Sequence, residues 1–293
     1  MRRKVISLGR STNVVSIPNS WCIQNKISKG DEIEMHENFN SLVISPMESK
    51  TYAKLDVTNM SPMIKRILGS YYKSGFDKIT VSFSTKEELY EVEEVIRDEF
   101  IGFEIISNSD DEITAKSVSE PNLEEFENML RRMMLIITSM LESLLLDKLS
   151  DSDKDKVILA DKDVNKIADY CRRTINKNSL WAISKTLKRN PPLYFIVEQL
   201  EKIGDEARDL ARCKNIENVS DILKEISIYF NSFYDLFYRF ELHKVSSFGE
   251  ERCRLKKMID ERIKEGYFEE LVICRNILEK TFDMNGPLMA LKN

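Results

Sequence analysis

Hydrophobic and polar residues alternate at the start of the chain and follow a helical repeat in its C-terminal half. From about residue 121, apolar side chains recur every three or four positions, which places them on one face of a helix. This pattern predicts six helices, over about 123–150, 152–176, 190–213, 218–240, 246–264 and 267–283. Gly286 and Pro287 are expected to end the last helix.

The first 46 residues alternate in the manner of short strands. Four strand-like segments are centred on residues 5–8, 14–17, 33–35 and 42–44, with one helical turn at 21–26. Gly9, Pro18 and Gly30 separate these segments. Because chains below about 40 residues seldom bury enough apolar surface alone, we expect this segment to oligomerise.

Residues 51–118 alternate between strand and helix patterns. Strands are predicted over 52–57, 78–83, 103–106 and 113–116, and helices over 62–73 and 84–98. Ser84 and Glu87 have the spacing of a capping box at the start of the second helix. The order predicts a small α+β sandwich, serving as an effector-sensing domain or, the interpretation we favour, as a rigid spacer.

The stretch 193–213 carries two distinct faces. Its apolar face is formed by Ile196, Leu200, Ile203, Ala207 and Leu210. Its second face carries a row of carboxylates, Glu198, Glu201, Asp205 and Asp209. Such stacked carboxylates repel one another by a few tenths of a kcal/mol per pair unless positive charge neutralises them. The sequence of residues 200–205 is partly repeated at residues 278–283, which suggests two similar helical units.

The segment Leu-Glu-Lys-Ile-Gly-Asp-x-Ala at 200–207 resembles the acidic signature of the PhoU family of phosphate-uptake regulators. The resemblance spans roughly residues 121–293. It implies two sequential three-helix bundles, one over about 119–213 and the other over about 217–285. It also implies carboxylate motifs that bind metal ions in some members.

The residues matching those motifs are the candidate metal ligands. They are Asp161, Asn165, Asp169, Glu201, Asp205, Asp209, Glu279 and Asp283. Their oxygens suit Mg²⁺, Mn²⁺, Fe or Ca²⁺, and Zn²⁺ is included as a further candidate. Because Asn165 stands where the family pattern has an acid and the motif weakens in the second bundle, we expect at most one competent site. The alternative is a solvated acidic face paired with Lys202 and Arg208.

The N-terminal pattern Lys-Val-x-x-Leu-Gly-x-Ser-x-x-Val-Val-x-Ile-Pro, continued by Lys-Gly-Asp-x-Ile and Leu-Val-Ile, resembles the AbrB-type swapped-hairpin DNA-binding domain. That resemblance implies a β-barrel interleaved from two chains. The residues it places on the DNA are Arg2, Arg3, Lys4, Arg10, Ser11 and Asn13. Through residue 30 there are six basic residues and no acidic one, which favours a polyanionic partner. The alternative is a module that dimerises without binding DNA.

Composition limits the remaining classes of function. The chain has 293 residues, 42% hydrophobic and 32% charged, which is typical of a helix-rich globular protein. Five scattered cysteines without a Cys-x-x-Cys pair predict reduced thiols and a cytoplasmic protein. No apolar run reaches the ~20 residues of a membrane span, so no membrane insertion is expected. With two histidines and no nucleophile–base set, we expect no catalytic residues and no enzyme.

A di-iron oxidase is also disfavoured, because such sites pair carboxylates with a Glu-x-x-His motif and neither His36 nor His243 stands near a carboxylate motif.

Together these features predict a multidomain α+β protein with three parts. They are a dimeric swapped-hairpin β-barrel (1–46), an α+β connector (51–118) and an all-α pair of three-helix bundles (119–293). The combination resembles the archaeal PhoU-domain regulators that begin with an AbrB-type domain. It implies a phosphate-responsive transcriptional regulator that binds DNA as a homodimer. The alternative is a cytoplasmic adaptor that docks on a phosphate ABC transporter ATPase or its sensor kinase, with the N-terminal barrel used only to dimerise.

Overall fold

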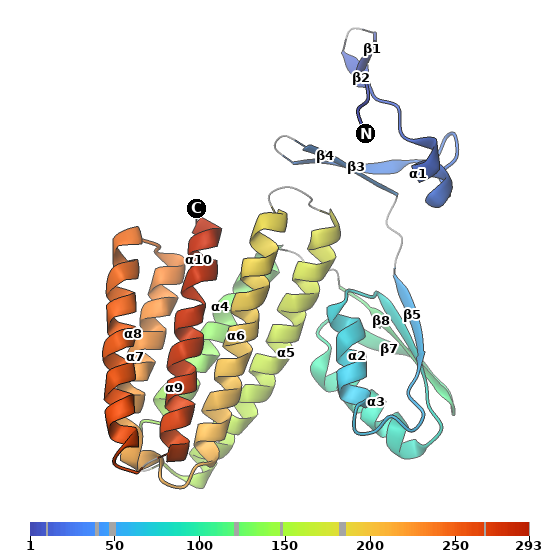
Figure 1. Ribbon diagram of the computed structural model, residues 1–293. Coiled ribbons are helices and arrows are strands. Elements are labelled where there is room, and N and C mark those ends of the chain that lie inside the picture. The colour runs from blue at the N-terminus through green and yellow to red at the C-terminus, as the bar shows by residue number, and fades with distance from the viewer. Residues whose placement is uncertain are drawn as a thin grey trace. The chain divides into compact units, whose positions relative to one another are not determined.

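The computed structural model describes residues 1–9, 11–38, 41–46, 51–119, 123–146, 149–181, 186–266 and 268–292. The chain divides into two compact units, Met1–Ser49 and Lys50–Asn293. Figure 1 shows the helices and strands of both units.

The first unit contains two separate antiparallel hairpins and one short helix. Strand β1 (Ile6–Leu8) pairs with β2 (Thr12–Val14), and β3 (Ile33–Asn38) pairs with β4 (Ser41–Pro46). Helix α1 (Asn19–Gln24) lies between them in sequence. The described residues show no hydrogen-bonded ladder between the two hairpins, so a single chain does not form the closed barrel expected from the sequence. An isolated two-stranded hairpin is at best marginally stable in water.

The second unit begins with a four-stranded mixed sheet. Its elements are β5 (Tyr52–Asp56), α2 (Ile64–Lys73), β6 (Lys78–Ser82), α3 (Lys86–Glu99), β7 (Phe103–Asn108) and β8 (Glu112–Ser117). The strand order is β5-β6-β8-β7, with β5 parallel to β6 and the other pairs antiparallel. Helices α2 and α3 cover one face, where Ile79, Val81 and Ile113 are buried with Leu68 and Val92 (Figure 1). The predicted α+β sandwich is therefore present.

The capping box at the start of α3 lies one residue later than predicted. The backbone N–H of Glu88 donates to Thr85 Oγ1 at 3.2 Å, and Thr85 N–H donates to Glu88 Oε2 at 3.1 Å. The prediction of Ser84 and Glu87 was wrong because tertiary contacts select Glu88. Its carboxylate also accepts from the N–H of Asn59 at 2.6 Å, in the loop after β5.

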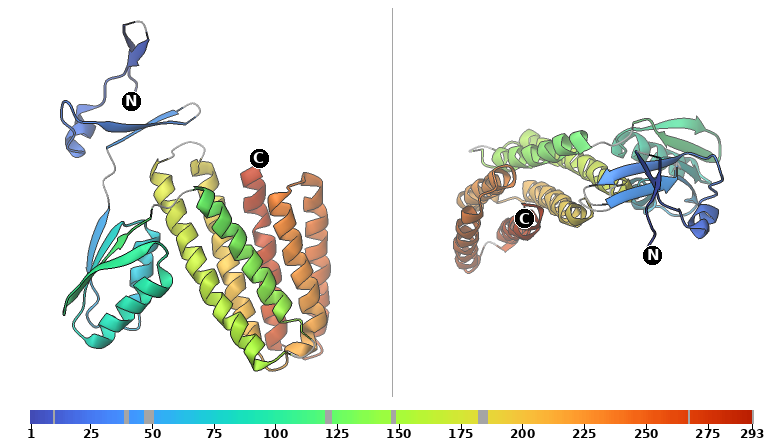
Figure 2. Two further views of the ribbon diagram at one scale, coloured as in Figure 1. Left: turned by 180° about the vertical axis from the view of Figure 1, so that it is seen from behind. Right: turned by 90° about the horizontal axis from the view of Figure 1, so that it is seen from above.

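The remaining described residues are mainly helical. It contains α4 (Leu123–Ser143), α5 (Asp151–Trp181), α6 (Thr186–Arg212), a 3₁₀ turn (Ile216–Val219), α7 (Ser220–Tyr238), α8 (Leu242–Ile263), α9 (Phe268–Asp283) and α10 (Asn285–Lys292). Figure 2, viewed from above, shows these helices nearly end-on and side by side. One continuous core, from Phe126 to Leu288, is shared by the two predicted bundles. No helix among the described residues is long and apolar enough to cross a membrane.

The structure differs from the prediction in two segments that contain proline. Pro191 and Pro192 lie inside α6, which begins before them, and α5 continues to Trp181. The sixth predicted helix ends at Asp283 as expected, but an additional helix, α10, follows it, and Gly286 and Pro287 lie in the first turn of α10. Proline is tolerated in a first turn because the N–H groups there have no intrahelical partner.

Candidate functional site

The predicted metal ligands of the first bundle lie where α5 packs against α6. We call the carboxylates of Asp161, Asp169, Glu198, Glu201, Asp205 and Asp209 the acidic stripe. Gly204 allows the two helices to approach, since a Cβ at that position would lie 2.9 Å from Val164 Cγ1. The glycine of the Ile-Gly-Asp segment therefore has a packing role.

Arg208 on α6 holds one end of the acidic stripe. Its Nη1 lies 2.9 Å from Asp161 Oδ2 and 2.6 Å from Asp205 Oδ1, and its Nε lies 3.0 Å from Asp209 Oδ1. One guanidinium therefore bridges three carboxylates from two helices. Such charge-assisted bonds are stronger than neutral ones.

Arg172 on α5 holds the other end. Its Nη1 lies 2.8 Å from Asp169 Oδ1, and its Nη2 lies 2.7 Å from Glu198 Oε2 and 3.5 Å from Glu201 Oε2. The side chain is only 7% exposed. Burial alone would lower the pKa of Arg172, but the three carboxylates around it raise the pKa above its ordinary value.

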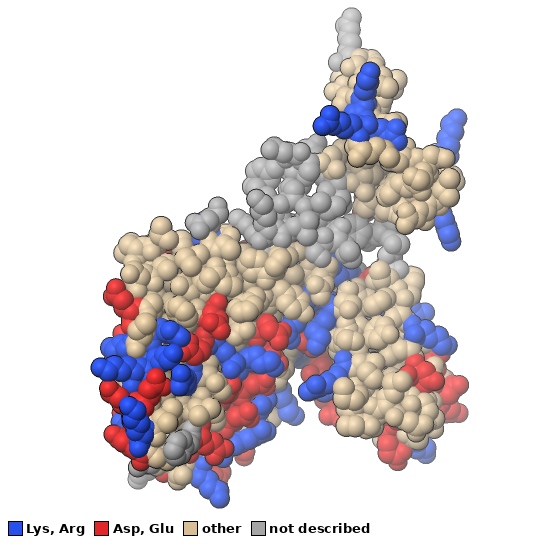
Figure 3. Space-filling model, in the orientation of Figure 1, with Lys and Arg blue, Asp and Glu red and all other residues tan. Residues whose placement is uncertain are grey.

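Lys202 joins the two ends. Its Nζ lies 3.0 Å from Glu201 Oε2 and 3.1 Å from Asp205 Oδ2. Positive and negative groups therefore alternate without a break from Asp169 to Asp209. Figure 3 shows the same mixture of Lys and Arg with Asp and Glu over the surface of the helical region.

The ion pairs continue into the α+β domain. Lys73, the last residue of α2, has its Nζ 3.4 Å from Asp169 Oδ2. Arg173, next to Arg172, is 1% exposed and donates to the carbonyls of Tyr72 at 3.0 Å and Phe76 at 2.8 Å. These carbonyls lie at and just beyond the C-terminal end of α2, so α5 caps a helix of the neighbouring domain.

Aromatic rings and a carboxylate surround Arg173 at this joint. Its guanidinium carbon lies 5.1 Å from the centroid of the Tyr72 ring and 4.9 Å from that of Phe103. Asp77 Oδ1 lies 3.5 Å from Arg173 Nη2 and 2.5 Å from Lys177 Nζ. We did not predict a role for Arg172 or Arg173 from the sequence. Their positions beside the apolar residues Ala168, Cys171 and Ile175 were the available signal, since long cations at the edge of a buried face seek partners.

The acidic stripe does not fit a metal ion as it stands. Among the described residues, no three His, Cys, Asp or Glu side chains are arranged to hold a metal. Most of the stripe's oxygens already bind guanidinium or ammonium groups. Among the described oxygens of the stripe, Asp161 Oδ1 is the one that is buried without a hydrogen-bond partner, and burial raises the pKa of this carboxyl despite the nearby Arg208. Asn165 donates its amide N–H to Asp161 Oδ2 at 3.3 Å.

The predicted ligands of the second bundle, Glu279 and Asp283, do not lie with the carboxylates of the acidic stripe. Glu279 accepts from Arg252 Nε at 3.0 Å and Nη2 at 2.6 Å. Asp283 is exposed at the end of α9. The structure therefore unites Asp161, Asp205 and Asp209, and separately Asp169 and Glu201, but not Glu279 or Asp283 with either group.

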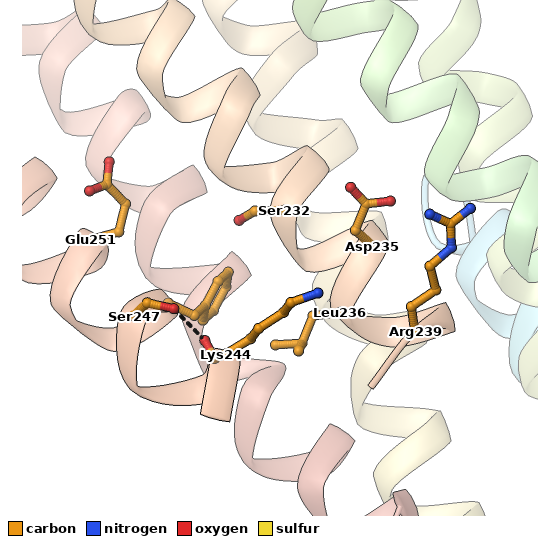
Figure 4. A pocket seen from close by; sticks show the side chains of 8 residues that line it. Ser232, Asp235, Leu236, Arg239, Lys244, Ser247 and Glu251 are labelled. Atoms are coloured by element: carbon orange, nitrogen blue, oxygen red, sulfur yellow. Dashed lines mark hydrogen bonds between the residues drawn. The ribbon is translucent and has the colours of Figure 1, made fainter. Parts of the chain in front are cut away.

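A surface hollow of about 480 Å³ lies between α7 and α8 (Figure 4). It is lined by Ser232, Asp235, Leu236, Arg239, Lys244, Ser247, Phe248 and Glu251. Lys244 Nζ binds Glu241 Oε1 at 2.5 Å, and Ser247 Oγ donates to the Lys244 carbonyl at 3.0 Å. With two acids and two bases in its wall, the hollow favours neither an anion nor a cation.

The predicted DNA-binding residues lie in and around the first hairpin. Arg2, Arg3 and Lys4 are exposed, and none of the ion pairs among the described residues involves them. Ser11 and Asn13 are also exposed, and Asn13 Oδ1 accepts from Ser7 Oγ at 3.0 Å. Arg10 lies outside the described residues.

Comparison with known proteins gives a likeness among solved structures and none among family models or curated proteins. No family model matches the chain, and no curated protein matches it. Among solved structures, it is similar to the crystal structure of PhoU from Pseudomonas aeruginosa, with 15% sequence identity and a TM-score of 0.47. The match covers 58% of this chain and 96% of that chain.

Proposed function

We propose that the protein is a homodimeric, phosphate-responsive transcriptional regulator of the cytoplasm, which binds DNA through its first unit and is not an enzyme. The observation that carries this proposal is the lack of buried residues in the described part of Met1–Ser49. A folded module with no interior requires a partner to supply one.

The apolar side chains of the first hairpin support a second copy as that partner. Val5 is 70% exposed and Leu8 is 65% exposed, and Ile6, Val14 and Val15 are exposed as well. Contiguous exposed apolar strands mark an interaction surface. A second copy offers the same strands with the same apolar residues, and a symmetric pairing would bury both sets.

The basic side chains beside this hairpin support DNA as the ligand of the dimer. No described acidic residue pairs with Arg2, Arg3 or Lys4, so their charge is available to phosphate groups. In a two-fold dimer, each contact is made twice. Each neutralised phosphate releases counterions and steepens the salt dependence of binding by about 0.9 in log K per log salt.

The phosphate response is assigned to the helical region, as the resemblance of 200–207 to the PhoU signature implies. The joint at Arg173 supports a mechanical role for this region, since it holds the α+β domain firmly on α5. A change in the bundle would therefore reach the α+β domain, which is linked directly to the DNA-binding unit.

The test is DNA binding by the intact protein at several salt concentrations, with and without inorganic phosphate. We expect a steep salt slope that the Arg3→Ala/Lys4→Ala/Arg10→Ala variant reduces by up to about five, while the dimer persists. The matched control replaces three exposed lysines of the second unit, Lys162, Lys257 and Lys264, and should keep the slope. Absence of DNA binding at low salt would leave the first unit as a dimerisation module, and the adaptor for a phosphate transporter or sensor kinase would replace this proposal. An unchanged affinity with phosphate would remove the phosphate response.

A further inference from the structure

The acidic stripe is divided into two groups of three carboxylates, and each group surrounds one guanidinium. Asp161, Asp205 and Asp209 surround Arg208, and Asp169, Glu198 and Glu201 surround Arg172. In both groups the carboxylates come from α5 and α6 together. The cation therefore joins the two helices, as a bridging metal ion would.

The position of Arg208 Nη1 corresponds to that of a cation bridging the two helices. This single nitrogen lies 2.9 Å from an oxygen of Asp161 on α5 and 2.6 Å from an oxygen of Asp205 on α6. Nε of the same side chain reaches Asp209 at 3.0 Å. A cation at that point would find two carboxylates from two helices directly and a third nearby.

We infer that Arg172 and Arg208 are the resident cations of the acidic stripe, so that the helical region folds without metal, and that Arg208 occupies a latent divalent-metal site formed by Asp161, Asp205 and Asp209.

The oxygen count explains why metal and arginine exclude each other. A hard divalent cation takes about six to eight oxygen ligands, several of them charged. In this stripe the oxygens that face the cation positions are bound to N–H donors. Asp161 Oδ1 is the one stripe oxygen among the described residues that is buried and unpartnered, and a single such oxygen does not form a site.

Replacing Arg208 by an uncharged residue should favour metal binding at these carboxylates. Asp161, at 4% exposure, then loses its cation, while Asp205 keeps Lys202 and Asp209 keeps Arg212. An unpaired buried carboxylate is costly, and a divalent cation held by Asp161 together with Asp205 and Asp209 supplies the missing charge in the most compact form. We therefore expect the variant to recruit a metal ion that the wild type rejects. The inference is independent of DNA binding.

The experiment measures Mn²⁺ binding and thermal unfolding for the wild type, Arg208→Ala and Arg212→Ala. Arg212 is the matched control, because it lies one turn further along α6 and pairs with Asp209 alone at 3.2 Å. We expect Mn²⁺ to leave the unfolding temperature of the wild type and of Arg212→Ala unchanged. Arg208→Ala should unfold at a lower temperature without metal, recover with Mn²⁺ and bind it at least about tenfold more tightly than the wild type.

Two results would overturn the inference. Wild-type protein that retains one Mn²⁺ per chain after dialysis would show that arginine and metal coexist. A folded Arg208→Ala that gains neither stability nor affinity with Mn²⁺ would show that no latent site exists. Should Arg208→Ala fail to fold, Arg208→Gln takes its place. Arg208→Lys, which keeps the charge, is expected to stay indifferent to Mn²⁺, and its stabilisation by the metal would also contradict the inference.

Discussion

The strand residues of Met1–Ser49 whose burial is described are exposed or half-buried, whereas Lys50–Asn293 contains two hydrophobic cores. The larger of these cores runs from Phe126 to Leu288 in the helical region. The two units also differ in charge pairing. Among the described residues, no acidic partner is found for Arg2, Arg3 or Lys4, while Arg172 and Arg208 each bind three carboxylates.

This difference separates a unit with exposed apolar strands from one whose apolar side chains form closed cores. Contiguous exposed apolar strands mark an interaction surface. In the helical region, by contrast, the apolar face is buried and the carboxylates of the acidic stripe are paired with cations. Substitutions in the two units should therefore be detected by different measurements.

The largest effect is expected from Arg173→Met in the second unit. The substitution keeps an apolar stem beside Tyr72 and Phe103 but leaves two carbonyls and Asp77 without this donor. We expect the free energy of unfolding of the α+β domain and its joint to fall by about 3–5 kcal/mol, the range for breaking a buried charged network. Urea unfolding and hydrogen exchange at the end of α2 measure it.

The control for this joint is Arg212→Met. Arg212 is 57% exposed and pairs with Asp209 on the surface. An exposed pair contributes about 0–1 kcal/mol, so its removal should be nearly silent. Equal losses in the two variants would show that Arg173 does not hold the domains together.

The next largest effect is expected in the first unit, where Leu8→Asp places a charge on the apolar hairpin. We expect the dimer to weaken by at least about thirtyfold, which corresponds to about 2 kcal/mol and is typical of an interface hot spot. Sedimentation measures the dimer, and circular dichroism should show unchanged helix content. Leu135→Asp, at a 49% exposed position of α4, should leave the dimer intact. Dissociation by both variants, or by neither, would disprove a dimer formed through the first hairpin.

A smaller effect is expected at the contact of α5 with α6. Gly204→Ala would place a Cβ 2.9 Å from Val164 Cγ1 and force the helices apart, at a cost of about 1–3 kcal/mol. Gly249→Ala is the matched substitution within α8, where a Cβ meets nothing within 4 Å. It should raise the free energy of unfolding by up to about 1 kcal/mol, because alanine favours the helix. A stabilised Gly204→Ala would contradict close packing at the acidic stripe.

The smallest effect is a pH dependence at Asp77. Burial alone would raise the pKa of this carboxyl, but bonds from Lys177 and Thr51 outweigh it and hold the pKa below its ordinary value. Its stabilising contribution is therefore present above the unfolded pKa and is lost as the pH falls through the native pKa. The wild type should be more stable than Asp77→Asn at neutral pH, and this advantage should shrink in acid.

Urea titrations of both proteins at neutral and acidic pH measure this difference. Asp163→Asn, at an exposed position of α5, is the control and should show no such trend. An advantage of the wild type that grows in acid would mean that the carboxylate of Asp77 is not the stabilised form.

Much of the fold could be predicted from the sequence because its signals are local. The three- and four-residue apolar spacing located the long helices, and the alternation in 51–118 located the strands and helices of the α+β domain. The same spacing placed the carboxylates of 198–209 on one stripe. Local signals were weaker at helix boundaries. The sequence did not predict the helix whose first turn contains Pro287, and the capping residue of α3 is Glu88 rather than the predicted Glu87.

The sequence by itself determined that a row of carboxylates would lie beside a buried face, because periodicity is a property of one helix. Only the tertiary structure decided what neutralises them. Arg208 belongs to the same helix as most of its partners, but Arg172 and Lys73 come from α5 and α2, and no spacing within 193–213 shows their approach. Likewise, the short, basic, alternating start already predicted too little apolar burial within one chain, but which of its apolar side chains stay exposed emerged only from the structure. Neutralisation and burial depend on which segments meet in space, and for that reason they follow from packing rather than from local pattern.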